Sequence, residues 1–557
     1  MSLVIITSID SDFNSIKKNE RGVIMAQTKD ETIREVTVEY LAGIDMNNIP
    51  SSADIQAGIL DGISNAFDIE NAIRSKDKKW RAPERLSPVQ IAMIAVALHP
   101  VAAIETAGKN SDKSYRLLGI YQDDGENTGI YDVTDEALEN LAEMYCFGMT
   151  EREVAEFKRH LRRLAPTKQL CKEKNLIAVN NGIFDYDTKQ LLSFSADYVF
   201  TTKSRVNYNP LARNITIHNQ DDGTDWDVES WMKSLSDDPE IVNVLWEILG
   251  AIIRPNVPWG KSAWFYSDTG NNGKGTLCEL MRQLCGEGSY ASIPLSDMGK
   301  DFMLEPLTKA TAIIVDENDV GIYIDKAANL KAIITGDTIT INRKFKTPLP
   351  YQFKGFMVQC LNELPRIKDK SDSFFRRQLF ILFTKCFTGV ERKYIKNDYL
   401  HRQEVLEYVM WRVLNMTYYQ LSEPQACKDA LADYKEYNDP IRQFASEVMP
   451  RLQWDLVPFA FLYDLYVAWY KRNVATTGME GKTKFLKSFK SIVTEYSEWV
   501  YGDVPCRVGQ RMSKPEHMIQ EYNLTEWMNK RCLGSNDMDK ICTPAIIPES
   551  CRGIYRI

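Results

Sequence analysis

The segment Ser262–Leu284 reads SAWFYSDTGNNGKGTLCELMRQL and decides the fold. An apolar run leads into a loop with Gly270, Gly273 and Gly275, and apolar residues at helical spacing follow. The pattern predicts a strand, a phosphate-binding loop and a helix. Glycines let backbone N–H groups converge on phosphate oxygens, a helix start attracts anions, and Lys274 can reach the outer phosphates. Nucleotide hydrolysis is therefore the leading hypothesis.

This loop departs from the usual G-x-x-x-x-G-K-[ST] pattern in two places. Asp268 stands at the position of the first glycine, and Gly275 stands where a magnesium-binding hydroxyl is expected, with Thr276 one residue later. A plain glycine-rich turn is the alternative for the loop alone. The predicted nucleotide-binding residues form one continuous set: Gly270, Asn271, Asn272, Gly273, Lys274, Gly275 and Thr276.

Size and composition limit the classes of protein to consider. The 557 residues suffice for three or four domains, and 44% hydrophobic with 26% charged residues is ordinary for a soluble globular protein. A net charge of −8 means that any contact with nucleic acid must come from local clusters or an internal channel. The sequence lacks an apolar run of membrane-spanning length and a convincing secretory signal, so we expect a cytoplasmic protein without membrane contact. The eleven cysteines lack C-x-x-C spacing. The last four could be considered zinc ligands, but their gaps are long and irregular, so we expect reduced structural thiols at Cys506, Cys532, Cys542 and Cys551.

Two further apolar runs end in polar residues downstream of the loop. Residues Ala312–Val315 form a β-branched run that ends in Asp316 and Glu317. One carboxylate can hold the magnesium of a nucleotide, and the other can orient the attacking water. The run Phe356–Leu361 ends in Asn362, whose amide can hydrogen-bond the γ-phosphate, although an asparagine that caps a turn is the alternative.

A pair of arginines precedes the apolar strand predicted at 379–383. Arg376 or Arg377 could stabilise the charge that develops on the γ-phosphate of a neighbouring subunit. A solvated strand start beside packed aromatic residues is the alternative.

A basic hairpin is predicted between the carboxylate strand and the amide strand. Thr338–Ile341 alternates as a strand, and Tyr351–Phe356 returns. The tip suits phosphate contact combined with stacking on a DNA strand, because it carries Arg343, Lys344, Phe345 and Lys346. An exposed charged hairpin without a ligand is the alternative.

A second basic element is predicted in the helix Lys482–Val493. Three lysines recur at i, i+3 and i+6, namely Lys484, Lys487 and Lys490. An apolar stripe accompanies them, formed by Leu486, Phe489 and Val493. This pattern is typical of a winged-helix recognition helix that faces DNA, and an amphipathic surface helix is the alternative.

In this order, the motifs resemble superfamily 3 helicases, and more narrowly the phage/plasmid primase-helicase family that includes the poxvirus primase-helicase. The matching segments are TGNNGKGT (269–276), IIVDEN (313–318), LKAIITGDTITINRKFK (330–346), NELPR (362–366) and FFRRQLFILF (374–383). The resemblance covers about residues 115–390 well and extends more loosely to the C-terminal part.

The resemblance implies an α/β fold with an AAA+ P-loop ATPase core, an α+β N-terminal collar and a C-terminal winged helix. We expect five regions: a disordered leader at 1–24, a helical region at 25–112, a collar at 113–255, the superfamily 3 ATPase at 256–424 and the winged helix at 425–557. Met25 follows Glu-Arg-Gly-Val-Ile and is a candidate for the natural start.

The resemblance also implies roles for individual residues, with ATP and Mg²⁺ as cofactors. Lys274 would bind the β- and γ-phosphates, Asp316 and Thr276 would act through Mg²⁺, and Glu317 would polarise water. Asn362 would sense the γ-phosphate, and Arg376 or Arg377 would act on the neighbouring subunit. The hairpin tip 343–346 would grip DNA.

These roles predict an ATP-dependent replicative DNA helicase in a bacterial host cell. A homo-hexameric ring would pass a single strand through its pore, bind duplex through the C-terminal domain, and unwind the origin of a phage, plasmid or genomic island. The alternative is an ATP-switched platform that binds an origin or loads a helicase without unwinding. A separate primase or polymerase partner stays open, and residues 1–115 lack the cluster of acids that a primase centre needs.

Overall fold

The computed structural model describes residues 28–107, 115–324, 326–344, 346–474 and 479–557, which form two compact units. The first unit comprises the chain to Pro365 together with Arg376–Ala426, and the second comprises Arg366–Phe375 and Cys427–Ile557. The second unit thus begins close to the expected boundary at 424/425 and also takes in a short upstream segment. The expected leader 1–24 and Met25 lie outside the described residues.

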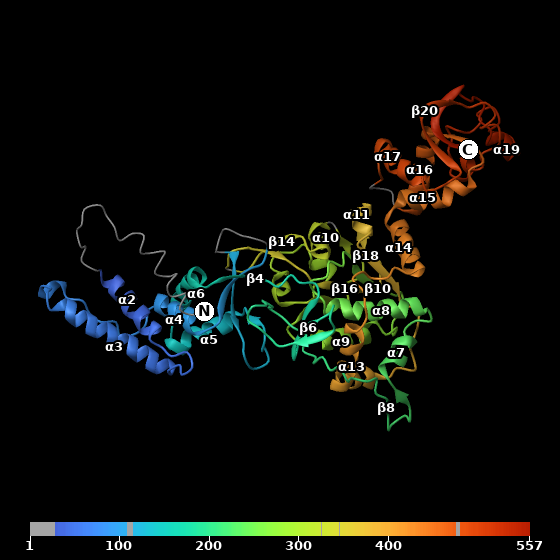
Figure 1. Cartoon of the computed structure of the whole chain (residues 1–557). Helices are drawn as coiled ribbons and strands as arrows, with labels where there is room; N and C mark the ends of the chain where they lie inside the picture. Colours follow the sequence, from blue (N-terminus) through green and yellow to red (C-terminus); the bar gives the residue numbers. More distant parts are fainter. Residues whose placement is uncertain (1–27, 108–114, 325, 345, 475–478) are drawn as a thin grey trace. The chain divides into compact units, whose positions relative to one another are not determined.

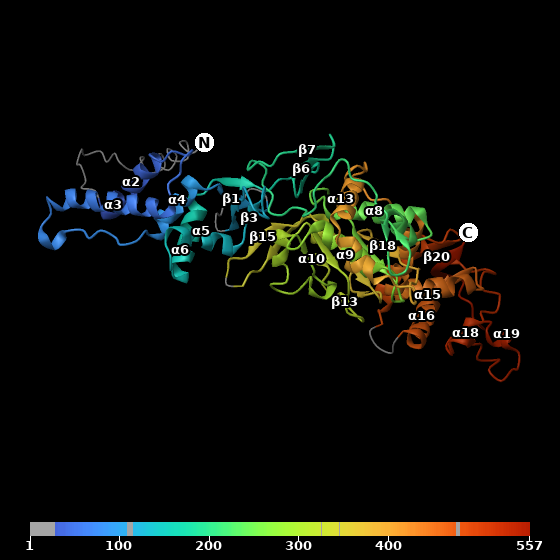
Figure 2. The ribbon, with the colours of Figure 1, turned by 90° about the horizontal axis from the view of Figure 1, so that it is seen from below.

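The first unit opens with helices that bury one apolar face. In α3, Ile55, Ile59, Ile63 and Phe67 recur every four residues and are fully buried. Figure 2 shows α2 and α3 lying side by side. The helices of this part are α2 (Lys29–Ala42), α3 (Ser52–Asn71), α4 (Pro88–Leu98), α5 (Asp135–Tyr145) and α6 (Glu151–Leu164).

Through two of its strands, a four-stranded sheet shares one hydrophobic core with helices α2 to α6. Its strand order is β3-β2-β1-β4. The strands are β1 (Val101–Glu105), β2 (Leu117–Tyr121), β3 (Tyr131–Asp132) and β4 (Thr167–Gln169). The expected boundary at 112/113 therefore falls inside a packed module, because β1 lies before it and pairs with β2 after it.

The segment between this module and the loop strand is built from small sheets and two helices. The strands are β5 (Leu176–Val179), β6 (Gly182–Asp185), β7 (Gln190–Leu192), β8 (Ile217–His218) and β9 (Asp225–Trp226). The segment 228–252 forms two helices rather than one, α7 (Val228–Ser234) and α8 (Pro239–Ile252). The break has a local cause, since Asp238 caps α8 with its side chain and Pro239 takes the first helical position.

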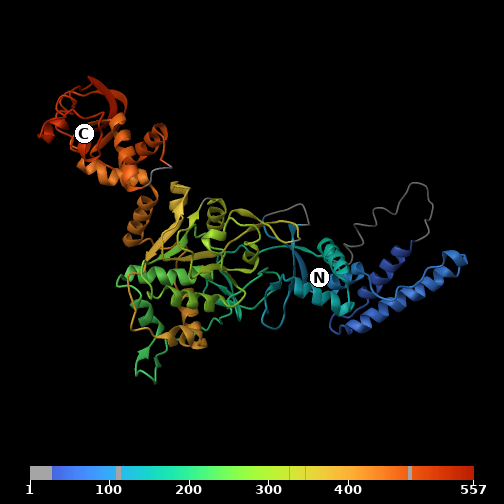
Figure 3. The same ribbon diagram turned by 180° about the vertical axis from the view of Figure 1, so that it is seen from behind.

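A five-stranded, all-parallel sheet forms the centre of the first unit (Figures 1 and 3). Its order is β11-β12-β16-β10-β18. The strands are β10 (Ser262–Tyr266), β11 (Tyr290–Ala291), β12 (Ala312–Val315), β16 (Phe356–Leu361) and β18 (Gln378–Leu382). The apolar runs predicted as strands are confirmed, and β12 and β16 are buried along their whole length.

Helices and a hairpin connect and cover these strands. Helix α9 (Lys274–Cys285) follows the loop after β10, and the antiparallel pair β14–β15 separates β12 from β16 in sequence. The remaining elements here are β13 (Tyr323–Ile324), α10 (Ala328–Thr335), β14 (Thr338–Ile341), β15 (Leu349–Gln352), α12 (Lys393–Asn397) and α13 (Gln403–Leu414). Parallel strands end at one edge of the sheet, so the segments after β10, β12 and β16 meet there.

The second unit combines helices with a three-stranded antiparallel sheet of order β19-β21-β20. Its helices are α11 (Asp372–Phe375), α14 (Gln425–Asn438), α15 (Pro440–Val448), α16 (Phe459–Asn473), α17 (Lys482–Val493), α18 (Met518–Glu521) and α19 (Met538–Ile541). Its strands are β17 (Arg366–Ile367), β19 (Leu456–Pro458), β20 (Trp499–Arg507) and β21 (Ser550–Arg556). Among the helices of both described units, none is both long and apolar enough to cross a membrane.

A candidate nucleotide site at the carboxyl edge of the parallel sheet

The predicted phosphate loop lies between β10 and α9. Asn271 has a φ of 51° and Gly273 a φ of 88°, so two residues of the loop adopt the left-handed conformation. Such backbone turns direct successive N–H groups into a concave anion-binding surface. A Cβ atom on Gly273 would lie 2.7 Å from Leu235 Cδ2, so both conformation and space favour glycine there. The predicted strand, loop and helix are confirmed as structural elements.

A distant segment braces the loop. The backbone N–H of Phe387 donates to Asn271 O at 2.7 Å, and Asn271 Nδ2 donates to Glu391 Oε1 at 3.0 Å and to Thr388 Oγ1 at 3.3 Å. Inside the loop, Asn272 Nδ2 donates to the carbonyl oxygen of Thr269. These bonds fix the loop before any ligand binds.

Lys274 is the first residue of α9 and its side chain turns inward. The residue is only 5% exposed, and its Nζ donates to Asn362 Oδ1 at 3.1 Å. Burial lowers the pKa of the Lys274 ammonium, while the nearby charge of Asp316 acts in the opposite direction. Asn362 follows β16, so a bond between residues 88 positions apart joins the loop to the neighbouring strand end.

The carboxylates follow β12 at the same edge. Asp316 is half-buried, and its Oδ2 lies 3.6 Å from Arg282 Nη2 and 3.9 Å from Lys396 Nζ. Glu317 is exposed to solvent. The next residue ties this strand end to β16, because Asn318 Nδ2 donates to Gln359 Oε1 at 2.9 Å and to the Cys360 carbonyl oxygen at 3.0 Å.

The geometry at Gly275 explains how this chain departs from the usual loop pattern. A Cβ atom on Gly275 would lie 3.0 Å from Asp316 Oδ1 and 3.2 Å from Oδ2, so the carboxylate closely approaches the loop backbone. The half-buried Thr276 follows on the first turn of α9. Carboxylate and hydroxyl oxygens are donors that Mg²⁺ accepts, so Asp316 and Thr276 fit a magnesium ion.

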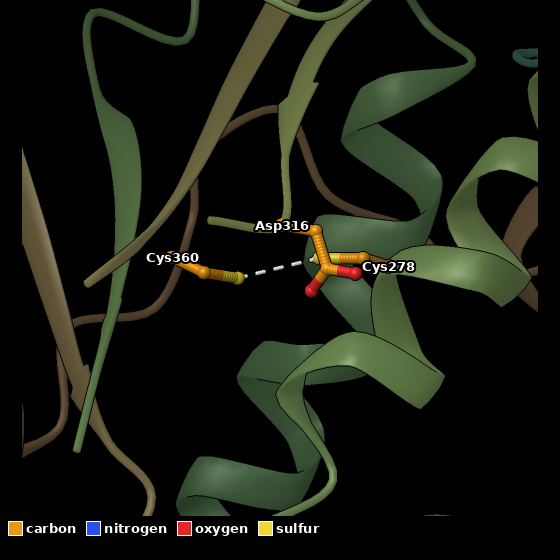
Figure 4. A group of neighbouring side chains, drawn as sticks. All are labelled: Cys278, Asp316 and Cys360. Atoms are coloured by element: carbon orange, nitrogen blue, oxygen red, sulfur yellow. Dashed lines mark hydrogen bonds between the residues drawn. The ribbon is translucent and has the colours of Figure 1, made fainter. Parts of the chain in front are cut away.

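Two thiols lie beside Asp316 (Figure 4). Cys278 of α9 and Cys360 of β16 are 0% and 1% exposed, with their Sγ atoms 3.3 Å apart. Contact with Cys278 and burial raise the pKa of the Cys360 thiol well above its ordinary value. One donor atom from each of Cys278, Cys360 and Asp316 lies within 4.8 Å of the others.

The two predicted trans-acting arginines lie at the opposite edge of the sheet. Ser262 at the start of β10 pairs with Gln378 at the start of β18, and Ser262 N donates to Arg377 O at 2.8 Å. The phosphate loop follows the other end of β10, five residues away or about 16 Å along the strand. Arg376 is exposed and Arg377 is half-buried. Neither arginine therefore joins Lys274 at the site of its own chain.

The basic hairpin tip follows β14. Arg343 is half-buried and donates through Nη2 to Thr347 O at 2.8 Å, and burial lowers the pKa of its guanidinium. Lys344 and Lys346 are exposed, and Lys346 forms an ion pair with Asp135 of α5. The predicted aromatic contact residue, Phe345, lies outside the described residues. Two of the predicted contact residues, Lys344 and Lys346, are thus solvent-facing.

The three lysines of α17 all face solvent in the second unit. Lys484 Nζ lies 2.9 Å from Glu480 Oε1, and Lys490 forms an ion pair with Asp503 of β20. The opposite face packs into the core through Phe485, Phe489, Ile492 and Val493. Of the predicted apolar stripe, Phe489 and Val493 are buried and Leu486 is only half-buried.

Sequence reasoning missed four residues at the nucleotide edge: Arg282, Lys396, Cys278 and Cys360. Arg282 lies two helical turns after Lys274 on α9, a spacing that could have suggested proximity to the site. Lys396 comes from α12, and its sequence context carries no comparable signal.

Comparison with known proteins finds three family models on separate parts of the chain. Residues 76–237 match the D5 N terminal like family, residues 265–377 match a family of unknown function, DUF5906, and residues 436–529 match the Poxvirus D5 protein-like family. The DUF5906 match contains the phosphate loop, Asp316 and Asn362.

Individual proteins are similar at low identity. A putative helicase, L207/L206 of Acanthamoeba polyphaga mimivirus, is 25% identical over 238 residues, which is 40% of this chain and 23% of that protein. One apo structure of the NrS-1 C-terminal region is 14% identical, covers 72% of this chain and 86% of that chain, and has a TM-score of 0.38. Another apo structure of this region is 15% identical, covers 85% of this chain and 100% of that chain, and has a TM-score of 0.41.

The two D5 models flank the candidate site on its N- and C-terminal sides, and the mimivirus relative is named as a helicase. The mimivirus match spans about a quarter of that protein's length. These matches support the resemblance to the phage-type primase-helicase family that the sequence motifs indicate.

Proposed function

We propose that this chain is an ATP-dependent DNA helicase of superfamily 3 that assembles as a hexameric ring and unwinds the origin of a phage, plasmid or genomic island. The observation that carries the proposal is the bond from Lys274 Nζ to Asn362 Oδ1, at 3.1 Å, at the sheet edge that also holds Asp316. A buried lysine, an amide and a carboxylate beyond a glycine loop are the groups that phosphoryl transfer needs.

The sheet supports an AAA+ core for this proposal. The loop strand β10 lies between β16, which carries the amide, and β18, which begins beside the arginines. The carboxylate strand β12 lies on the far side of β16. The groups that we propose to face the nucleotide thus follow three adjacent parallel strands of one chain, and we assign the arginines to a neighbouring subunit.

We assign the following chemistry to the chain's own residues. The loop N–H groups and Lys274 would neutralise phosphate charge, and Asn362 would hydrogen-bond the γ-phosphate or its attacking water. Asp316 and Thr276 would hold Mg²⁺, which when bound would neutralise further phosphate charge. Glu317, exposed at the strand end, would orient the water and accept its proton.

The ring and its DNA contacts complete the proposal. Arg376 or Arg377 would reach the γ-phosphate of the next subunit, and we favour Arg376 because it is exposed. Lys344 and Lys346 at the hairpin tip would contact a single strand in the pore. In the second unit, helices α15, α16 and α17 pack together beside a three-stranded antiparallel sheet. This arrangement supports a winged helix whose α17 lysines would face duplex DNA.

The decisive experiment compares Lys274→Ala with Lys354→Ala, an exposed lysine near the start of β16. ATP turnover should fall by at least about 100-fold in the first variant and remain near wild type in the second, because Lys274 would compensate phosphate charge and Lys354 has no assigned role at the site. Normal turnover by Lys274→Ala would reject the site. Strand displacement of a forked duplex with Mg-ATP tests the helicase itself, and turnover without displacement would favour the ATP-switched platform.

A mixing experiment tests the arginine in trans. Lys274→Ala and Arg376→Ala should each be inactive alone, whereas a mixture should regain part of the ATP turnover. Activity returns because some interfaces then join an intact Lys274 to an intact Arg376. A mixture as inactive as its components, under conditions in which mixed oligomers form, would contradict an arginine supplied by the neighbour.

A further inference from the structure

We propose that Cys278, Cys360 and Asp316 form a binding site for a thiophilic divalent metal such as Zn²⁺, and that this site is distinct from the magnesium site but shares Asp316 with it. The three side chains come from α9, β16 and the end of β12 and converge in Figure 4. Thiolate sulfur with one carboxylate oxygen is a donor set for zinc, whereas magnesium selects oxygen donors.

The spacing of the donors fits a tetrahedral centre. Zinc bonds of about 2.3 Å to sulfur and about 2.1 Å to oxygen place neighbouring tetrahedral donors roughly 3.6–3.8 Å apart. The two Sγ atoms are 3.3 Å apart, and all three donor atoms lie within 4.8 Å of one another. Side-chain adjustments of about an ångström or less would bring these separations to the tetrahedral values, and a water would complete the fourth position.

The surrounding charge suits a site with two thiolates. Without metal, Asp316 faces three cations, namely Lys274, Arg282 and Lys396. Binding would release both thiol protons to the solvent, so two thiolates, one carboxylate and one dication would leave a net charge of −1. The three cations would stabilise that charge, and no oxidation or reduction is involved.

Access and enclosure differ among the three donors. Cys278 and Cys360 are 0% and 1% exposed, whereas the Asp316 side chain is 28% exposed. A metal would therefore arrive from the side of Asp316, the edge of the sheet where the phosphate loop lies. Zinc bound by Cys278 and Cys360 would compete with a nucleotide-bound magnesium for the Asp316 carboxylate, so zinc should inhibit ATP hydrolysis. This inhibition rests on the proposed function, while metal binding itself does not.

Cadmium is the probe for binding, because thiolate ligands give it a charge-transfer absorption band in the ultraviolet. The intact, fully reduced chain is titrated with Cd²⁺ alone. Cys278→Ala and Cys360→Ala should each lose the same part of the band and weaken cadmium binding at this site by more than about 100-fold. That loss exceeds the one expected for a residue that only supports a ligand without contacting the metal. Cys285→Ala is the matched control, since Cys285 is on the same helix, fully buried and outside the cluster.

A second thiol pair provides a further control. Cys506 and Cys551 lie opposite each other across β20 and β21 and could also collect cadmium. Cys506→Ala should leave the part of the band assigned to Cys278 and Cys360 in place. A band that is lost in Cys506→Ala and kept in Cys278→Ala would overturn the proposal, as would equal loss in Cys285→Ala and Cys278→Ala.

Zinc inhibition is measured for each variant relative to its own rate without zinc. Zinc should inhibit ATP turnover of the wild type and Cys285→Ala at least about tenfold more strongly than that of Cys278→Ala. Equal inhibition of the wild type and both variants would reject a role for this cluster in inhibition. If the chain hydrolyses no ATP even without zinc, the proposed function fails while the cadmium spectra still decide the metal site.

Discussion

Lys274 and Lys487 are both helical lysines, one in each unit, and their surroundings are opposite. Lys274 begins α9, is 5% exposed and donates to Asn362, whereas Lys487 lies on the exposed face of α17. A buried lysine with a fixed partner contacts one ligand atom, and a lysine at another position cannot replace it. A solvated lysine acts through a field that salt screens and that its neighbours share. The comparison predicts specific, large effects at the first unit's edge and small, additive ones along α17.

The largest expected effect lies on the buried side of the same α17 helix. Phe489→Ala should lower the unfolding free energy of the second unit by about 3–5 kcal/mol, because Phe489 is 0% exposed within the core. Lys487→Ala should change it by less than about 0.5 kcal/mol. Urea denaturation followed by tryptophan fluorescence measures both, and similar losses would show that the lysine face is packed.

The next largest effect is expected on the rate of ATP hydrolysis when the partner of Lys274 is removed. Asn362→Ala should lower kcat for ATP by about 100-fold, because it removes a polar contact at the γ-phosphate and leaves the Lys274 ammonium without its Asn362 acceptor. Steady-state kinetics checks this, with Asn329→Ala as control, since that amide donates to Met298 O instead. An unchanged kcat would remove Asn362 from the site.

A smaller effect is expected at Gly275, where two substitutions separate crowding from chemistry. Gly275→Ala adds a Cβ 3.0 Å from Asp316 Oδ1, whereas Gly275→Ser adds the same atom plus a hydroxyl that can donate to that carboxylate. We expect Gly275→Ser to retain about tenfold more ATP turnover than Gly275→Ala. Equal losses at saturating magnesium would mean that crowding alone sets the effect.

The smallest effects are expected from single lysines of α17. Lys487→Ala should weaken duplex binding by about three- to fivefold and reduce the salt slope by about 1, if it contacts one phosphate. Lys490→Ala should do less, because Lys490 already pairs with Asp503. Fluorescence anisotropy at several salt concentrations measures both, with Lys530→Ala as an exposed control. A large loss of duplex affinity from one lysine substitution alone would contradict an electrostatic contribution shared among the three lysines.

The parallel sheet was predictable because its strands are continuous apolar runs that end in polar residues. Lys274, Asp316 and Asn362 follow three such runs, and carboxyl ends of parallel strands meet at one edge, so their proximity followed from local patterns. Their roles in hydrolysis stay predictions.

Other features could not be predicted from local patterns. The contact of Cys278 with Cys360 joins residues 82 positions apart and depends on how α9 packs on β16. The pair of β1 with β2 across the expected boundary is likewise set by tertiary packing. The break before Pro239, by contrast, has a local signal, because Asp238 caps α8 and Pro239 suits its first position.

Strand β18 has a mechanical consequence for a ring of such chains. Its first residue, Gln378, directly follows Arg376 and Arg377, and the segment after its last residue, Leu382, holds Asn271 through Phe387, Thr388 and Glu391. The strand therefore directly connects two edges of the sheet. One edge carries the arginines proposed to contact a neighbour's nucleotide, and the other carries the loop proposed to bind the chain's own nucleotide. A displacement at one end would reach the other through the strand backbone itself. In a ring, the β18 strands would link each nucleotide site to the next and would determine the order in which the sites hydrolyse ATP.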